Sequence, residues 1–543
     1  MKNLSARGTA SVLAMVLSCL GLARATVDGT IVDAATGAPI PNATVKYIPG
    51  PGSSITDALG HFHLPAPAEG ILRGSWNSLI PGTADLSGAV DARGKNLGMV
   101  PGSHARQPQF LFLPNPNPGT SATNRRHARA ADAGLRRNGI PPAKAAAAPT
   151  DCAVSIEAAG YRPRETNCLD GGENRIDIAA ATSVHYYPHI PVQLADGWIT
   201  DDVKTALPKM QPLQDMLDTL AAKKMKEVHS LLIVKGGKLL VEEYYTGNAD
   251  SIDFEHGIKR IKKGDIQWSR TQKHYLASCN KSITSMVVGL AMAKGGLPVN
   301  SLLSRFLPKY QALFTGAKAG ITLEHALTMT MGFQWDEWAG SNLADMWATQ
   351  DLVGYVLAKP NAAVPGSQWI YNSGGPNILL AAMENVVGDM ARFGDSALFA
   401  PLGITDYRWE KQPTGQPEGS ARMFMRPRDM AKLGLLYLKG GAWQGRQIVP
   451  ADWVAASTKL QKSAKPKSPN DYGYLWWIRK ATTPLGTAVD YYEAEGDGGQ
   501  YIVVLPAQDM VVVFTGGNYG DSQTYDGQIG RFLAKGVLPA ANL

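Results

Sequence analysis

Ser278 and Lys281 form the one S-x-x-K motif of this sequence. Apolar residues then recur at the spacing of one helix face, at Ile283, Met286, Val287 and Leu290. This pattern predicts a helix that begins near Ser278, with Lys281 one turn further along on the same side. A serine hydroxyl is a weak nucleophile until a nearby base takes its proton, and burial lowers the pKa of a lysine so that it can act as that base. The pair therefore predicts attack by Ser278 on an ester or amide.

Two further segments have residues suited to this chemistry. Residues 369–375 read W-I-Y-N-S-G-G and lead into a predicted helix, which would let the hydroxyl of Tyr371 reach the Ser278–Lys281 pair. Residues 496–500 read G-D-G-G-Q and stand directly before a predicted strand. Glycines in such a place allow another backbone to approach closely, so that a backbone N–H group there could stabilise an oxyanion.

In this order, S-x-x-K, Y-N-S and G-x-G-G-Q resemble the motifs of the serine β-lactamase and penicillin-binding-protein superfamily. Its branch of class C-like esterases and aminohexanoate-oligomer hydrolases is the most similar. The resemblance covers about residues 200–540. It implies an α+β fold, in which an antiparallel sheet has helices on its faces and a helical subdomain. It also implies that Ser278 is the acylated nucleophile, that Lys281 accepts its proton, and that Tyr371 is the proton shuttle to the leaving group and to the deacylating water.

The resemblance extends to the groups around these three residues. It implies an oxyanion hole made by the backbone N–H groups of Ser278 and Asp497, and substrate contacts from Asn372, Gly498 and Gln500. Neither a metal nor an organic cofactor is expected. Large aromatic side chains more often belong to the core than to a pocket wall, but five tryptophans after Ser278 are candidates for lining an acyl pocket: Trp335, Trp338, Trp347, Trp476 and Trp477.

Two positions depart from the family pattern and bear on the substrate. Ser373 stands where many relatives have asparagine, and Ala494-Glu495-Gly496 replaces the usual Lys-Thr-Gly. In relatives that lysine recognises a substrate carboxylate, whereas Glu495 and Asp497 would repel one if they face the site. We therefore expect a neutral or cationic ester or amide as the small-molecule substrate. The alternatives are a peptidoglycan D,D-peptidase or β-lactamase, and a non-catalytic cell-surface binding protein on a hydrolase scaffold, with cell-wall material as its partner.

The hydrolase segment, residues 190–543, begins and ends with predicted strand pairs. Apolar runs at 231–234 and 239–241 flank K-G-G-K, and runs at 501–505 and 510–514 lie on either side of A-Q-D, as expected for β-hairpins. Mostly helical sequence lies between the two pairs. The pattern predicts one antiparallel sheet built from both ends of the segment, with a helical region inserted between them.

Residues 26–180 have a different pattern. Short alternating strands and turns over residues 26–65 indicate a small β-sandwich. The sequence V-x-G-x-I-x-D-x-x-T-G-x-P-I-x-N-A-x-V, followed by T-D-x-x-G-x-F, resembles the carboxypeptidase regulatory-like domain, a transthyretin-like sandwich. An insertion at about residues 66–150 is rich in Pro, Gly and Ala and has an arginine cluster. We expect the insertion to be disordered; the alternative is a basic arm that binds an anionic cell-surface polymer.

The amino terminus predicts export. Two basic residues precede an apolar run at residues 10–22, and A-R-A at 23–25 fits cleavage before Thr26. Residues 1–25 are therefore expected to be a signal peptide. Lipid attachment at Cys19 is the alternative.

Composition agrees with a globular exported protein. Hydrophobic residues make up 44% of the chain and charged residues 18%, a composition that favours folded domains. A chain of 543 residues is too long for a single domain. The net charge is +7, but no base-reading motif accompanies it, so nucleic-acid binding is not expected.

Cys152 and Cys168 are expected to form a disulfide in an oxidising compartment. No later run has the length of a transmembrane segment, and the mature protein is expected to be periplasmic or secreted.

Overall fold

The structure is a computed structural model that describes residues 26–48, 50, 52–65, 153–167, 173–253, 259–338, 340–465, 468 and 470–542. The predicted signal peptide, the predicted insertion, Cys19, and the predicted pair Cys152 and Cys168 lie outside the described residues. Those expectations stay predictions. Among the described residues, no helix has the length and apolar character needed to cross a bilayer.

A nine-stranded sheet forms the centre of the hydrolase segment, in the order β20-β21-β22-β23-β24-β25-β9-β10-β8. Its strands are β8 (Ile199–Thr200), β9 (Val228–Lys235), β10 (Lys238–Tyr244), β20 (Lys462–Ser463), β21 (Asp471–Tyr472), β22 (Trp477–Thr482), β23 (Ala488–Gly496), β24 (Gln500–Leu505) and β25 (Met510–Gly516). The two predicted hairpins are β9–β10 and β24–β25. They join through antiparallel pairing of β25 with β9, in which Val512 lies opposite Ile233. The sheet is therefore built from both ends of the segment, as the strand pattern predicted.

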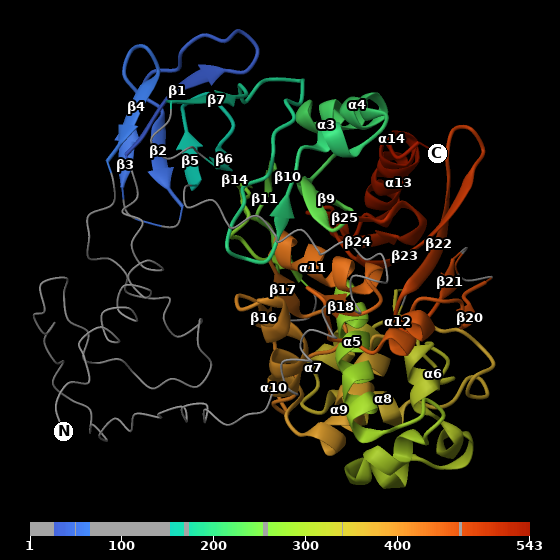
Figure 1. Cartoon of the computed structure of the whole chain (residues 1–543). Helices are drawn as coiled ribbons and strands as arrows, with labels where there is room; N and C mark the ends of the chain where they lie inside the picture. Colours follow the sequence, from blue (N-terminus) through green and yellow to red (C-terminus); the bar gives the residue numbers. More distant parts are fainter. Residues whose placement is uncertain are drawn as a thin grey trace, which may run out of the picture. The chain divides into compact units, whose positions relative to one another are not determined.

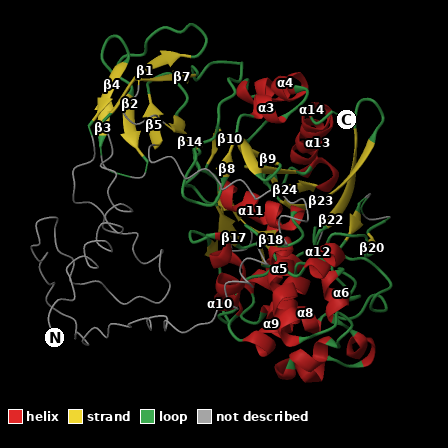
Figure 2. Ribbon diagram, viewed as in Figure 1, coloured by secondary structure: helices red, strands yellow, loops and turns green. Residues whose placement is uncertain are grey.

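Helices cover both faces of this sheet (Figures 1 and 2). On one face, α5 (Cys279–Gly295) and α11 (Pro427–Leu438) share an apolar core with the strand residues Leu232, Val234, Ile502 and Val504. On the other face, α4 (Met210–Ala221), α13 (Ser522–Phe532) and α14 (Leu538–Ala540) pack against the alternate residues Leu231, Ile233, Val503 and Leu505. Successive side chains of a strand point to opposite faces, so one run of apolar residues supplies both cores.

A helical region lies between β10 and β20 in the chain. Its longest helices, α5 and α9 (Gly374–Val387), pack against each other. The shorter helices are α6 (Leu323–Leu327), α7 (Asn342–Ala348), α8 (Leu352–Ala358), α10 (Met390–Gly394) and α12 (Ala451–Ser457). Before α5, the short strand β15 (His274–Tyr275) pairs with β17 (Met423–Met425), which also pairs with β16 (Arg408–Trp409). The predicted α+β architecture is confirmed for this segment.

The described amino-terminal residues form two small sheets, with strand orders β4-β1-β7 and β3-β2-β5-β6. These strands are β1 (Val27–Asp33), β2 (Thr44–Tyr47), β3 (Ser53–Ile55), β4 (His61–Leu64), β5 (Ala153–Glu157), β6 (Arg164–Asn167) and β7 (Glu173–Ile178). Apolar side chains from both sheets, such as Ile31, Val45, Phe62 and Ile156, share one core. A small β-rich module was expected here. Its assignment to the carboxypeptidase regulatory-like family, and the domain boundaries, stay predictions.

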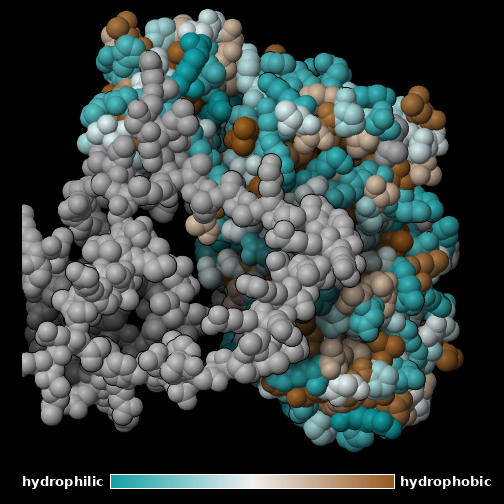
Figure 3. Space-filling model, in the orientation of Figure 1, coloured by the Kyte–Doolittle hydropathy of each residue, from teal (hydrophilic) through white to brown (hydrophobic). Residues whose placement is uncertain are grey.

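Polar and apolar residues are interspersed on the face of the molecule shown in Figure 3. The large apolar side chains that are exposed come from separate segments of the chain and include Ile55, Leu59, Val184, Trp338, Val364 and Leu485. Trp338 is the one aromatic residue in this exposed group among the described residues. Most of the exposed apolar surface is therefore scattered, which is normal for a globular protein.

Candidate active site

Ser278 lies where the chain passes from β15 into α5. The preceding residue, Ala277, has a φ of 47°. Such a left-handed conformation is uncommon for alanine, and strained residues of this kind cluster at functional sites. Ser278 is half-buried at the N-cap position of α5. One turn further on, Lys281 Nζ donates hydrogen bonds to Ser278 Oγ at 2.8 Å and to the Ser420 carbonyl oxygen at 3.0 Å.

The Lys281 side chain is enclosed by the protein, with 2% of the residue's surface exposed. Burial lowers the pKa of Lys281, because water no longer stabilises its ammonium form, and the nearby carboxylates of Glu337 and Glu418 act in the opposite direction. A lysine with a lowered pKa loses its proton more readily and can then accept one from Ser278. The environment of Lys281 therefore suits the predicted base.

Tyr371 lies beside this pair, just before the start of α9. Lys281 Nζ is 4.9 Å from the centroid of the Tyr371 ring. Burial raises the pKa of Tyr371 well above its ordinary value, and a side-chain hydrogen bond with Ser278 acts in the opposite direction. The Tyr371 hydroxyl is thus protonated at neutral pH and reaches Ser278. The structure brings the three residues of the predicted catalytic set together.

The turn between β23 and β24 lies against the loop that leads into α5. A β-carbon added to Gly496 would lie 2.2 Å from the Leu276 carbonyl oxygen and 3.1 Å from the Cys279 nitrogen, so glycine is needed for this close approach. The Asp497 carboxylate accepts a hydrogen bond from Gly520 N at 2.8 Å, and burial raises the pKa of Asp497. The Asp497 side chain is engaged by the loop at Gly520. A role of its backbone N–H in an oxyanion hole stays a prediction.

Three other residues were predicted to contact the substrate. Asn372 is buried, and its Oδ1 accepts a hydrogen bond from Gly374 N at 2.7 Å. Gln500 is also buried, and its Nε2 donates to the Gly516 carbonyl oxygen at 2.7 Å. Gly498 lies in the β23–β24 turn with a φ of 90°. Both amide side chains are therefore used within the protein, and substrate contacts by the three residues stay predictions.

Glu337 is a neighbour of this site that sequence reasoning missed. It is buried, and its carboxylate accepts hydrogen bonds from Ser373 N at 3.1 Å, from the Ser373 hydroxyl, and from Trp335 Nε1 at 2.6 Å. At Ser373 the family resemblance led us to expect asparagine. Here the backbone N–H and hydroxyl of Ser373 bind a carboxylate from another loop.

Glu418 is a second missed residue. It is fully buried and accepts hydrogen bonds from the backbone N–H groups of Ser420, Ala421 and Arg422 at 2.7–3.1 Å. These bonds fold the backbone into the turn whose Ser420 carbonyl accepts from Lys281. The stretch Q-P-E-G-S-A-R around Glu418 matches no motif, so the sequence had no signal for this role.

The charges near the site differ from the expectation. Arg479 of β22 forms ion pairs with both Glu493 and Glu495 of β23. Burial raises the pKa of the two carboxyl groups, and the Arg479 charge opposes this effect. Glu495 is therefore not a free negative charge, and the argument that it repels carboxylate substrates loses its basis.

The five candidate tryptophans separate into two groups. Trp335, Trp347 and Trp476 are buried and belong to the core. The rings of Trp338 and Trp477 each stack on the ring of Tyr371. Trp335, Trp347 and Trp476 are therefore core residues, as is common for large aromatic side chains. Trp338 and Trp477 border the predicted site.

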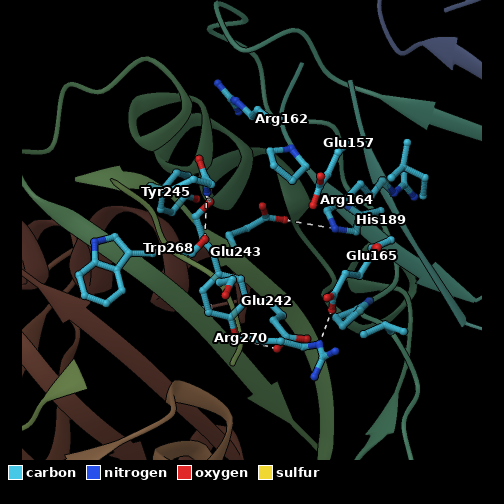
Figure 4. Close-up of a pocket in the computed structure, with 18 residues that line it drawn as sticks. Glu157, Arg162, Arg164, Glu165, His189, Glu242, Glu243, Tyr245, Trp268 and Arg270 are labelled. Carbon is cyan, nitrogen blue, oxygen red and sulfur yellow. Dashed lines mark hydrogen bonds and ion pairs between the residues drawn. The ribbon is translucent and has the colours of Figure 1, made fainter. Parts of the chain in front are cut away.

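A separate cavity of about 170 Å³ is lined by residues of β5, β6, β10 and the segment 267–270, and by none of Ser278, Lys281 and Tyr371 (Figure 4). Among its charged groups, Glu165 forms an ion pair with Arg270. Burial raises the pKa of Glu243 to about 7 and lowers that of His189, 3.5 Å away, to about 3. In the part of the chain that the structure describes, no group of three potential metal ligands is found.

Comparison with known proteins gives a match over most of the hydrolase segment. The family model described as Beta-lactamase matches residues 214–528. An uncharacterized protein of Alkalihalophilus pseudofirmus is 20% identical over 323 residues, which cover 55% of this chain and 86% of that protein. Esterase EstB of Burkholderia gladioli is 31% identical over 146 residues, which cover 24% of this chain and 37% of EstB. The solved structure of a penicillin-binding protein from Bacillus halodurans is 17% identical with a TM-score of 0.45, and covers 58% of this chain and 98% of that one.

Proposed function

This chain belongs to the beta-lactamase family, whose model matches residues 214–528, and on that premise we propose that it is an exported serine hydrolase that cleaves an ester or amide through an acyl-enzyme on Ser278. The observation that carries the proposal is the 2.8 Å hydrogen bond between Lys281 Nζ and Ser278 Oγ. The similarity to an esterase supports ester hydrolysis. Export rests on the sequence of residues 1–25.

Acylation begins when neutral Lys281 takes the proton of Ser278 Oγ, and Oγ forms a bond to the carbonyl carbon of the substrate. The carbonyl oxygen becomes an oxyanion that accepts hydrogen bonds from the backbone N–H groups of Ser278 and Asp497. The positive end of α5 also favours this negative charge. The intermediate then collapses and breaks the bond to the leaving group, which takes a proton from the Tyr371 hydroxyl. Lys281 returns that proton to Tyr371, and the acyl group remains on Ser278.

Deacylation uses the same groups in reverse. Tyr371 accepts a proton from a water molecule while its own proton passes to neutral Lys281, and the water oxygen attacks the acyl carbon. The bond to Ser278 Oγ breaks, and Oγ takes its proton from the Lys281 ammonium group. The net reaction consumes one water and releases an acid and an alcohol or amine.

Intact-mass spectrometry after treatment with a fluorophosphonate probe tests the proposal. The protein should gain one adduct, and Ser278→Ala should gain none. Ser282→Ala is the matched control, because Ser282 lies one turn away on α5 and its hydroxyl donates to the Leu475 carbonyl oxygen. That variant should keep the adduct. A folded wild-type protein without an adduct would overturn the acyl-enzyme proposal and favour the non-catalytic binding protein.

Substrate screening then separates the hydrolase alternatives. Turnover of short-chain esters or amides is the expected result. Turnover of a penicillin or of a D-alanyl-D-alanine peptide, with no turnover of esters, would instead favour the β-lactamase or peptidoglycan D,D-peptidase.

Gly496→Ala is expected to destabilise the protein by about 1–3 kcal/mol, because the added methyl group overlaps the Leu276 carbonyl. Turnover should fall by about tenfold or more, since the Ser278 loop must move away from the β23–β24 turn. Urea unfolding and ester kinetics measure the two effects. Gly527→Ala is the control, because Gly527 has open space around it on α13, and it should leave turnover unchanged. A Gly496→Ala protein with normal stability and turnover would contradict the role of this close approach.

A further inference from the structure

An aromatic cluster surrounds the proton-carrying tyrosine. We define the Tyr371 cluster as Trp338, Trp369, Tyr371 and Trp477. The ring of Tyr371 stacks with that of Trp338 at 5.8 Å between centroids and 16° between planes, and with that of Trp477 at 5.9 Å and 13°. Trp369 lies 5.9 Å from Tyr371 and 5.7 Å from Trp477. These separations are typical of attractive ring contacts.

Trp338 differs from the rest of the cluster in its exposure. It is 78% exposed, whereas Trp369 and Tyr371 are each 8% exposed. An aromatic ring that stacks on a buried tyrosine and yet leaves most of its surface open presents a flat apolar wall at the edge of the site. Burial of such a wall against a planar apolar group is favourable.

The position of Trp338 is held by its neighbour in the sequence. Glu337 is buried and binds the backbone N–H and hydroxyl of Ser373, two residues after Tyr371. The same carboxylate accepts a hydrogen bond from Trp335 at 2.6 Å. The loop that bears Trp338 is therefore tied to the Tyr371 segment, which gives the exposed ring a defined place.

The mechanism decides which part of the substrate this wall borders. Tyr371 is the group that protonates the leaving group in the proposed acylation, so the rings that stack on Tyr371 lie on the leaving-group side. Resting on that proposed function, we infer that Trp338 and Trp477 select esters or amides whose leaving group bears an aromatic ring.

Two side chains already lie over rings of the Tyr371 cluster. Lys281 Nζ already lies 4.9 Å from the centroid of Tyr371, and Arg479 lies over the ring of Trp477 at 5.6 Å. The exposed ring of Trp338 remains open to an aromatic leaving group. The leaving group is therefore specified by its aromatic ring.

A pair of butyrate esters tests this inference. Benzyl butyrate and cyclohexylmethyl butyrate give the same acyl-enzyme and have leaving groups of similar size, of which one is aromatic. In the wild-type full-length protein, kcat/KM for the benzyl ester should exceed that for the cyclohexylmethyl ester by about tenfold, the scale of one or two ring contacts. Trp338→Ala and Trp338→Leu should both reduce this ratio to near one. The leucine variant keeps apolar bulk, so that its loss of preference points to the ring.

Leu485→Ala is the matched control, because Leu485 is likewise exposed, at 85%, but lies in the connection between β22 and β23. It should leave the ratio unchanged. A ratio that persists in both Trp338 variants, or that falls equally in Leu485→Ala, overturns the inference while fluorophosphonate labelling of Ser278 still supports the proposed function. Absence of labelling in the wild-type protein overturns both.

Discussion

Replacing Lys281 with alanine should slow acylation of Ser278 by about 10³-fold, the usual contribution of a general base. Lys281 Nζ is the group that contacts Ser278 Oγ, at 2.8 Å, and alanine leaves the hydroxyl without a proton acceptor. Single-turnover kinetics with an ester, followed by rapid-quench mass spectrometry, measures the acylation rate. Circular dichroism and thermal unfolding check that the variant is folded.

Lys281→Arg separates the role of the base from that of the positive charge. Arginine keeps the charge but does not lose its proton in proteins, so this variant should be as slow as Lys281→Ala. Normal acylation in Lys281→Arg would show that a cation suffices, and normal acylation in a folded Lys281→Ala would remove Lys281 from the mechanism.

The pH dependence of kcat/KM also tests whether Lys281 is the base, and it needs no substitution. In the proposed mechanism, acylation requires the neutral form of Lys281, so kcat/KM should rise with pH through the pKa of this residue. Burial lowers that pKa, whereas Glu337 and Glu418 raise it. The rise should therefore occur below the ordinary lysine value of 10.5 and should be absent from the residual activity of Lys281→Ala.

Tyr371→Phe should lower turnover by about 10²- to 10⁴-fold, because the variant keeps the stacked ring but loses the hydroxyl that transfers protons. With an activated ester, whose leaving group needs no proton, acylation should be the less affected step. The acyl-enzyme should then accumulate, since deacylation requires a proton acceptor for water. Quenched samples analysed by intact mass measure its fraction over time.

Tyr474→Phe is the control for loss of a tyrosine hydroxyl. Tyr474 donates a hydrogen bond to Glu324 at 2.8 Å, and its replacement should leave turnover near the wild-type value. Normal deacylation in Tyr371→Phe would contradict the shuttle role and would transfer that role to Lys281 alone.

The proximity of Ser278, Lys281 and Tyr371 was predictable because each residue lies in a short motif with a local structural consequence. The apolar spacing after Ser278 predicted α5 and so placed Lys281 one turn away, and the structure has both. The glycines at 496–500 predicted a close backbone approach, which Gly496 makes with Leu276. A local sequence pattern is sufficient to predict the place of a functional side chain when a single helix or turn positions it.

Glu337 and Glu418 were not predictable, because their partners lie on other elements. Glu337 binds Ser373 from a loop 36 residues earlier, and Glu418 shapes a turn that meets α5 across 139 residues at Lys281. The charge argument about Glu495 was misleading for the same reason, since its partner Arg479 is on the neighbouring strand. A residue's type shows that it bears a charge, but only tertiary structure shows how that charge is balanced.

The fold likewise has elements that the sequence predicts and elements that it does not. Apolar runs on either side of short turns predicted the hairpins β9–β10 and β24–β25. A single sheet with both hairpins was expected because the strands must bury their apolar faces, and the structure joins the hairpins by pairing β25 with β9. The strands β8, β20 and β21 have two residues each, too few for any periodicity to be visible in the sequence. Of the three, β8 also pairs with a strand that is distant in the chain, β10.

Peptide mapping of the protein, quenched by acid during turnover of a butyrate ester, tests the central claim most directly. We expect the butyryl group on the peptide that contains Ser278, with fragmentation that assigns it to the Ser278 side chain, and no such peptide from Ser278→Ala. A butyryl group on another residue, or turnover in Ser278→Ala at the wild-type rate, would contradict the claim that hydrolysis proceeds through an acyl-enzyme on Ser278.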